Sequence, residues 1–140
     1  MGEVGEWQDH LFLAMTYLDG PSLHARLRNG PLPVHQAIDI ATQICRGLEE
    51  AHGKGLLHRD IKPGNLIISY NGLVRIVDFG LAWQPGDDHL TAVGTVVGTP
   101  VYMAPEQWQP QKVDHRADLW AVGIVLYEML CGRQIGRAHV

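Results

Sequence analysis

The segment from Ala117 to Cys131 is apolar on nearly every face, and it limits the folds open to this chain more than any other segment. Its longest apolar run, 119–130, is interrupted by Glu128. This run is too short for the roughly 20 residues that a membrane-spanning helix needs. A helix of this kind has to be surrounded by other elements, so we expect it to be the central helix of a folded domain.

A second long helix is expected to be amphipathic. After Pro33, apolar residues recur at helical spacing and mark one buried stripe: Val34, Ala37, Ile38, Ala41, Ile44, Cys45, Leu48 and Ala51. Gly53 and Gly55 should end this helix, because glycine most easily supplies the left-handed residue after the last turn. A short helix is expected over 22–28, closed by Asn29-Gly30.

The remaining apolar runs predict strands. The run 11–17 is bounded by turn residues and is expected to form a buried strand. Two β-prone runs, 66–68 and 73–77, flank Asn71-Gly72, which is typical of a hairpin with a type I′ turn. Such a hairpin brings the residues before its first strand and after its second to one open end. From 80 to 111 no periodicity persists, and a stretch of about 30 residues without regular structure usually carries function.

The composition excludes several classes of protein. The 140 residues are 46% hydrophobic and 19% charged, which is typical of a folded domain rather than a disordered chain. The net charge of −4 gives no basic patch for nucleic acid, and we expect no membrane segment within this chain. The two cysteines, Cys45 and Cys131, form no CxxC pair, so neither a disulfide framework nor a zinc site is indicated. A cytoplasmic location is expected.

Four motifs carry the functional signal. Residues 58–65 read His-Arg-Asp-Ile-Lys-Pro-Gly-Asn and fit H-R-D-x-x-x-x-N, and Asp78-Phe79-Gly80 follows after one hairpin. Residues 98–106 read GTPVYMAPE, and Asp118 opens the segment DLWAVGIVLYEML. In this order and with these gaps the motifs resemble those of protein kinases. The segments YLDGPSL and GLLHRDIKPGN are similar to those of bacterial serine/threonine kinases of the eukaryotic-like type.

The resemblance implies an α+β protein-kinase-like fold, mainly the helical C-terminal lobe with the hinge strand and the catalytic hairpin. No G-x-G-x-x-G loop and no V-A-I-K lysine precede the expected hinge, so the N-terminal lobe is expected to be largely missing. Residues 1–134 are then a partial kinase domain. Residues 135–140 break the helical pattern, and they can be back-translated into a common sequencing adapter read in frame, so a non-native tail is expected there.

Two functional classes stay open at this point. In the first, the chain is a fragment of an active Ser/Thr kinase, and its motifs describe the parent enzyme. In the second, it is a catalytically inactive truncated or pseudokinase binding module. Because the phosphate loop and the strand lysine are absent from the sequence, the isolated chain is expected to bind ATP weakly or not at all and to transfer negligible phosphate.

The resemblance also assigns roles to the motif residues. Phosphoryl transfer needs positioning and charge neutralisation more than covalent help. By resemblance, Asp60 accepts or orients the proton of the substrate hydroxyl, and Lys62 stabilises the transferring phosphate. Asn65 and Asp78 hold magnesium, a hard cation that prefers oxygen ligands. The implied cofactors are ATP and Mg²⁺, and the implied partners are protein substrates with Ser or Thr acceptors, as Lys62 and Thr99 indicate.

The hinge motif indicates where adenine is expected to bind. By resemblance, the segment 15–20 connects the two lobes and hydrogen-bonds adenine through its backbone, Thr16 included. Met15 guards the back pocket, Leu18 is the main hinge contact, and Ile67 forms the adenine floor.

The resemblance further implies an activation loop that is switched on by autophosphorylation. Arg59 is expected to pair with a phosphate on Thr91 or Thr95, since guanidinium binds phosphate oxygens well. Thr99 is expected to play a structural part, in contact with the catalytic loop. Five further residues are expected to brace the site: His58, Phe79, Gly80, Glu106 and Asp118. Of these, Asp118 ties down the backbone of the catalytic loop.

Overall fold

The computed structural model describes residues 3–8, 10–14, 16–79, 98–108 and 112–135. In chain order its elements are β1 (Glu3–Trp7), β2 (His10–Ala14), α1 (Leu23–Leu27), α2 (Val34–Gly53), η1 (Pro63–Asn65), β3 (Leu66–Ile68), β4 (Val74–Ile76), η3 (Pro100–Tyr102), η4 (Pro105–Trp108) and α3 (Arg116–Cys131). The strands form two antiparallel pairs, β1 with β2 and β3 with β4. The predicted α+β class is therefore confirmed.

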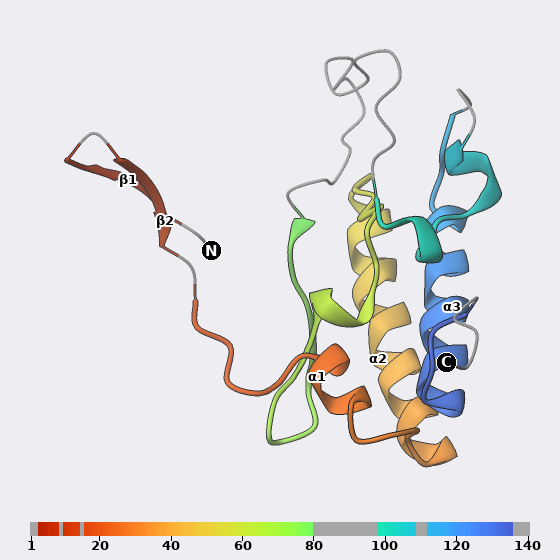
Figure 1. Cartoon of the computed structure of the whole chain (residues 1–140). Helices are drawn as coiled ribbons and strands as arrows, with labels where there is room; N and C mark the ends of the chain where they lie inside the picture. Colours follow the sequence, from red (N-terminus) through yellow and green to blue (C-terminus); the bar gives the residue numbers. More distant parts are fainter. Residues whose placement is uncertain (1–2, 9, 15, 80–97, 109–111, 136–140) are drawn as a thin grey trace.

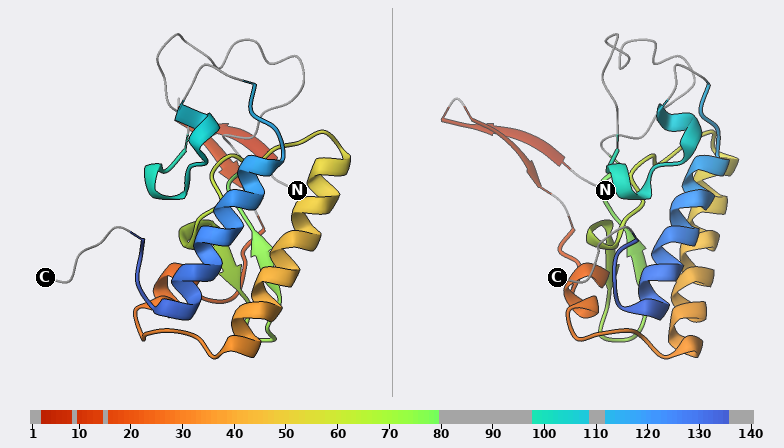
Figure 2. Two further views of the ribbon diagram at one scale, coloured as in Figure 1. Left: turned by 90° about the vertical axis from the view of Figure 1, so that its right-hand side faces the viewer. Right: turned by 45° about the vertical axis from the view of Figure 1, so that its right-hand side comes forward.

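The core lies where α2, α3 and the β3–β4 hairpin meet. Figures 1 and 2 show α2 and α3 side by side and antiparallel, with the hairpin packed against them. The Leu32 amide donates to the Met129 carbonyl at 2.8 Å and joins the chain before α2 to the end of α3. The largest fully buried side chains include Leu23, Ile44, Leu48, Ile61, Leu66 and Met129.

The buried face of α2 differs from the predicted stripe. Ala37, Ile40, Ile44, Leu48 and Ala51 are buried. Three residues of the predicted stripe are instead exposed, namely Val34, Ile38 and Cys45. The prediction was wrong there because both faces of the helix carry apolar side chains, and spacing alone did not show which one meets α3.

One glycine, Gly55, ends α2, whereas the sequence predicted that Gly53 and Gly55 both do so. Gly53 is the last helical residue, and Gly55 adopts the left-handed conformation with φ 76°. The Gly55 amide donates to the His52 carbonyl at 2.9 Å, and the Leu56 amide donates to the Ala51 carbonyl at 3.0 Å. These two bonds make a Schellman motif. This motif turns the chain from α2 directly into the segment that carries the H-R-D pattern.

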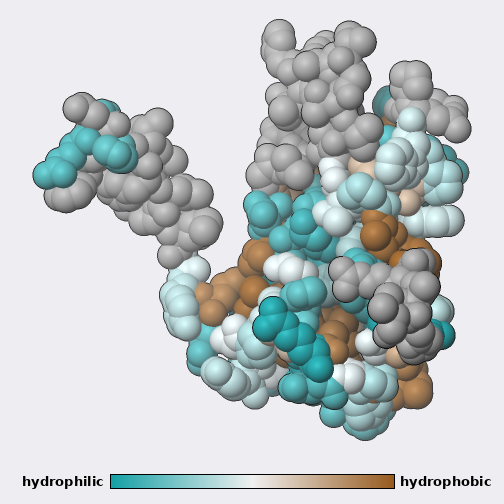
Figure 3. All heavy atoms as spheres, in the orientation of Figure 1, coloured by the Kyte–Doolittle hydropathy of each residue, from teal (hydrophilic) through white to brown (hydrophobic). Residues whose placement is uncertain are grey.

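Helix α3 is buried on one side only, although its sequence predicts burial all round. Ala121, Val122, Val125 and Met129 face the core. On the other side, four large apolar residues are exposed: Leu119, Trp120, Tyr127 and Leu130. Figure 3 shows apolar side chains at the surface on this side of the molecule. The prediction was wrong because α2 and η3 pack against only part of the helix surface. Within the described part of the chain, no helix is long and apolar enough to cross a membrane.

The β3–β4 hairpin is confirmed, but its turn is not of type I′. Only Gly72 has a positive φ, 83°, whereas a type I′ turn needs a positive φ at Asn71 as well. The Gly72 amide donates to the Ser69 carbonyl at 2.8 Å, and the Ser69 amide donates to the Leu73 carbonyl at 2.9 Å. The loop is therefore one residue longer than predicted, with the left-handed glycine after the turn. Gln43 of α2 supports it, because its amide oxygen accepts the Val74 amide at 2.9 Å.

The first strand pair was predicted only in part. The strand expected over 11–17 is β2 and ends at Ala14, and it pairs with β1, which the sequence pattern did not indicate. Figure 1 shows this pair apart from the helices, joined to them by an extended segment. That segment then meets β3, where Ile68 donates to the Pro21 carbonyl at 2.9 Å. Gly20, with φ 131°, allows this approach, because a Cβ there would lie 2.1 Å from the Ile68 carbonyl oxygen.

Both ends of α3 are fixed by local interactions. At its start, Asp114 accepts the Arg116 amide at 2.9 Å and the Arg116 guanidinium at 2.8 Å, and these bonds lower the pKa of Asp114 to about 2. At its end, Gly132 is left-handed with φ 68°. A Cβ on Gly132 would lie 2.7 Å from Pro31 Cδ and 2.8 Å from Pro31 N. Glycine is thus required both by the backbone conformation and by the close chain.

We expect Gly132→Ala to lower the free energy of unfolding by about 2 kcal/mol or more, because it combines a left-handed Cβ with a backbone clash. Urea unfolding followed by circular dichroism measures the loss. The control is Gly53→Ala at the end of α2, where nothing lies within 4 Å of the added Cβ. That variant should be neutral or slightly stabilising. Equal effects of the two substitutions would contradict this account of the α3 cap.

Candidate active site

The catalytic-loop motif is held by one buried carboxylate. Asp118, in the first turn of α3 and 2% exposed, accepts the His58 amide through Oδ2 at 2.9 Å and the Arg59 amide through Oδ1 at 2.8 Å. Arg59 has a φ of 69°, which is strained for a residue with a Cβ. Two charge-assisted hydrogen bonds to successive amides offset this strain. Burial lowers the pKa of the Arg59 guanidinium, and the nearby Asp118 carboxylate acts against that shift.

His58 braces the loop through its ring. It is fully buried, its Nδ1 accepts the Asp60 amide at 3.1 Å, and its Nε2 lies 2.9 Å from the Val77 carbonyl. A nitrogen that accepts from an amide carries no proton, so Nε2 carries the proton and donates to Val77. The Phe79 ring packs edge-on against His58 at 4.5 Å between centroids. His58 therefore joins the catalytic loop to the chain that leaves β4.

Asp60 is the point where the other polar residues of the loop converge. Its carboxylate is 8% exposed. The Thr99 hydroxyl donates to Oδ1 at 2.7 Å, while Lys62 Nζ lies 3.2 Å from Oδ2. Asn65 Nδ2 lies 3.4 Å from Oδ2 and donates to the Asp60 carbonyl at 2.8 Å. An ionised carboxylate has about four acceptor positions, so these three donors orient the group and leave room for one more.

The hairpin brings Asn65 and Asp78 to one end, as its geometry predicts. Asn65 ends η1, just before β3, and its carbonyl accepts the Val77 amide at 2.9 Å. Asp78 directly follows Val77, is exposed, and has a left-handed φ of 64°. The Nδ2 atom of Asn65 points toward Asp60, so the Oδ1 atom of the same amide points away from it. One amide oxygen and one carboxylate are oxygen donors of the kind that magnesium takes.

The hinge residues are only partly described. Met15 lies outside the described residues; Thr16 is exposed, and Leu18 is half-buried. Ile67, also half-buried, is bridged to Ser22 in antiparallel fashion, so the segment after the expected hinge lies along β3. Three other predicted residues, Gly80, Thr91 and Thr95, fall outside the described ranges as well.

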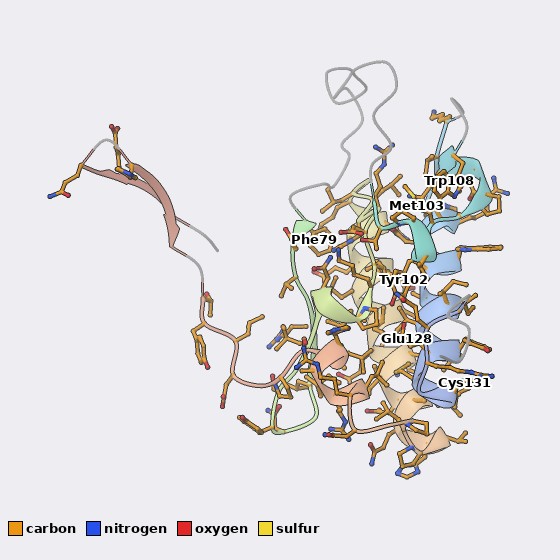
Figure 4. All side chains as sticks on the ribbon, in the orientation of Figure 1. Phe79, Tyr102, Met103, Trp108, Glu128 and Cys131 are labelled. Carbon is orange, nitrogen blue, oxygen red and sulfur yellow. The ribbon has the colours of Figure 1, made fainter. Side chains whose placement is uncertain are left out.

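The segment that begins at Gly98 is fixed at several points. The sequence predicted no regular structure over 80–111, yet two short 3₁₀ turns, η3 and η4, form within it. Thr99 accepts from Lys62 Nζ at 2.8 Å while donating to Asp60. Tyr102 donates its hydroxyl to Glu128 of α3 at 2.6 Å, and Figure 4 shows these two side chains pointing toward one another.

Some residues of the site carry a weak signal in the sequence or none at all. Glu128 interrupts an otherwise apolar helix, and this could have identified it as a buried polar contact. Gln107, half-buried, accepts the Ala104 amide at 2.8 Å and lies 3.5 Å from the Arg59 carbonyl, but no pattern indicated it. His52 contacts Asp118, but it belongs to none of the motifs and nothing in its spacing indicates this contact. Glu106 is half-buried in η4.

Comparison with known proteins identifies the class. A family model described as "Protein kinase domain" matches residues 1–139, so the chain belongs to the protein kinase domain family.

Among its relatives is a Corynebacterium efficiens protein named "Serine/threonine-protein kinases drp72", 45% identical over 135 residues that cover 94% of this chain and 26% of that protein. Serine/threonine-protein kinase PknH of Mycobacterium tuberculosis is 42% identical over 137 residues, covering 97% of this chain and 22% of PknH. The alignment with PknA of Corynebacterium glutamicum covers 88% of this chain and 26% of that kinase, at 44% identity. The chain thus spans about a quarter of the length of these curated relatives.

We expect Tyr102→Phe to lower the free energy of unfolding by about 1–3 kcal/mol, because the buried Glu128 carboxylate loses the hydroxyl that donates to it. Chemical unfolding checks the value. Tyr70→Phe, at a tyrosine that is 81% exposed, is the matched control and should change stability by less than about 0.5 kcal/mol. In the Glu128→Gln background the Tyr102→Phe cost should shrink. An unchanged cost in that background would show that the pair is not coupled.

Proposed function

We propose that this chain supplies the catalytic machinery of a serine/threonine protein kinase, which transfers the γ-phosphate of ATP to Ser or Thr hydroxyls of proteins. The observation that supports this most is the carboxylate of Asp60, held by Thr99, Lys62 and Asn65 with one acceptor position left. A substrate hydroxyl that donates to this position is oriented for attack, and Asp60 takes its proton. The names of the relatives favour the same activity.

Lys62 and Thr99 complete the site for the acceptor. Lys62 Nζ lies 3.2 Å from Asp60 and 2.8 Å from the Thr99 hydroxyl, and it is half-buried. A positive charge beside the attacking hydroxyl stabilises the charge that develops on the transferring phosphate oxygens. In this proposal the same lysine contacts both Asp60 and Thr99 and keeps the acceptor aligned between them.

Asn65 and Asp78 fit a magnesium site. They offer one amide oxygen and one exposed carboxylate at the same end of the β3–β4 hairpin, and magnesium is commonly bound by one or two protein side chains plus substrate phosphates. Magnesium, when bound with ATP, neutralises charge on the phosphate oxygens. The part of this chain is to hold the two oxygens in place, through the bond from Asn65 to Asp60 and the strained backbone at Asp78.

The remaining residues follow from the same proposal. Thr16, Leu18 and Ile67 belong to the adenine site, together with Met15. Arg59 binds a phosphorylated activation loop, and autophosphorylation at Thr91 or Thr95 stays a prediction. Proteins with Ser or Thr acceptors are the proposed partners.

The test is transfer of labelled γ-phosphate from ATP to a protein substrate, by this chain and by the longest open reading frame that contains it. In the form that is active, Asp60→Ala should lower kcat about 100-fold or more. Glu49→Ala, at an exposed carboxylate on α2, should leave the rate unchanged. Phosphate on tyrosine alone, or an Asp60→Ala rate equal to that of the native protein, would contradict the proposal, as would no transfer by the longest form.

A further inference from the structure

Gln43, in the middle of α2, bonds to the start of β4 in the way that a neighbouring strand would. Its Oε1 accepts the Val74 amide at 2.9 Å, and its Nε2 donates to the Gly72 carbonyl at 3.0 Å. These two backbone groups flank Leu73. In a parallel sheet, one residue of the adjacent strand bonds to such a pair, the carbonyl before a given residue and the amide after it. A single side-chain amide therefore takes the place of a strand at this edge.

The groups around the Gln43 amide determine which way it points. Its Nε2 also donates to Asp39 Oδ2, which lies 2.9 Å away on the same helix. A carboxylate and a backbone carbonyl only accept hydrogen bonds, whereas the Val74 amide only donates. Exchanging the two ends of the side-chain amide would place a donor against a donor at Val74 and an acceptor against an acceptor at Gly72. All three bonds therefore require one orientation, which Asp39 helps to fix.

The β3–β4 hairpin depends on contacts at both of its outer edges. Its strands have three paired residues each, and a two-stranded hairpin is marginally stable at best by itself. At the edge of β3, the Ile68 amide donates to the Pro21 carbonyl. Beside β4, the side chain of Ile76 lies against α2 at Gly47, where an added Cβ would be 3.1 Å from Ile76 Cδ1. Gln43 lies one turn before Gly47 and supplies the polar part of this contact.

We propose that Gln43 is a positioning residue for the magnesium ligands, because it sets the place of β4 on α2 and thereby that of Asp78, two residues beyond the strand. Asn65 is tied to the same strand, since its carbonyl accepts the Val77 amide at 2.9 Å. An extended strand covers only about 10 Å from Val74 to Val77, so a displacement at one end is carried to the other. The role in magnesium binding rests on the proposed function, whereas the effect on the hairpin does not.

The test is amide hydrogen exchange of Val74 and Val77 in this chain and in Gln43→Met, which has a side chain of similar size but lacks the hydrogen bonds. Exchange at Val74 should become about 10-fold faster or more, because its acceptor is lost. Exchange at Val77, at the far end of the strand, should become faster as well. The matched control is Thr42→Ala, at the exposed neighbour whose hydroxyl donates to the Ile38 carbonyl of its own helix. This variant should leave both amides unchanged.

Faster exchange at Val74 with native exchange at Val77 would show that Gln43 holds the loop alone, and this would overturn the proposal. Native exchange at both amides would overturn it as well. If Gln43→Met does not fold, Gln43→Glu decides in the same way, because a carboxylate cannot donate to the Gly72 carbonyl. Faster exchange at Val77 in that variant supports the proposal, and native exchange there contradicts it. None of these readouts needs kinase activity, so a failure here is distinct from a failure of the proposed function.

In the form that transfers phosphate, Gln43→Met should also change the dependence of the rate on magnesium. The free Mg²⁺ concentration for half-maximal rate should rise about 10-fold, the low end of what the partners of metal ligands contribute. The KM for the protein acceptor should stay unchanged. A variant that only folds less completely would lower kcat and leave both constants as they are. A native Mg²⁺ dependence in Gln43→Met would therefore overturn the role in magnesium binding.

Discussion

The buried carboxylate of Asp118 is the interaction on which the site depends. It stands on α3 and holds two successive amides of the catalytic loop, at the place where Arg59 has a strained backbone. A left-handed conformation costs roughly 1–3 kcal/mol for such a residue, and these bonds offset part of that cost. The next residue is Asp60, so the place of its backbone depends on Asp118, while Thr99, Lys62 and Asn65 orient its carboxylate. The packing of α2 against α3 serves to keep Asp118 in place.

Much of this arrangement could be predicted because it is encoded locally. The Schellman end of α2, the hairpin around Asn71-Gly72 and the motif residues 58–65 are each specified by residues near one another in the chain. The hairpin alone predicts that Asn65 and Asp78 come to one end. These features need no knowledge of what the helices pack against, which is why the patterns were sufficient for them.

The predictions that were wrong or missing concern contacts between segments that lie far apart in the chain. Val34, Ile38 and Cys45 fit helical spacing, but the choice of the buried face of α2 is made by α3 and β4. The exposed side of α3 has the same cause. Likewise, His52 and Glu128 owe their partners to tertiary contacts, Asp118 being 66 residues from His52 and Tyr102 being 26 residues from Glu128. Glu128 at least interrupts an apolar run, whereas no local pattern distinguishes His52 from an ordinary surface or core position.

Hydrogen exchange of the His58 and Arg59 amides in Asp118→Asn tests the central claim most directly. Asparagine keeps the shape of the side chain but replaces one acceptor oxygen with a donor, which would face an amide N–H. We expect exchange of at least one of these amides to become about 10-fold faster or more, while the amides of α2 and of the β3–β4 hairpin keep their protection. Asp39→Asn, at an exposed acid on α2, should change neither. Unchanged protection of both loop amides in Asp118→Asn would contradict the account.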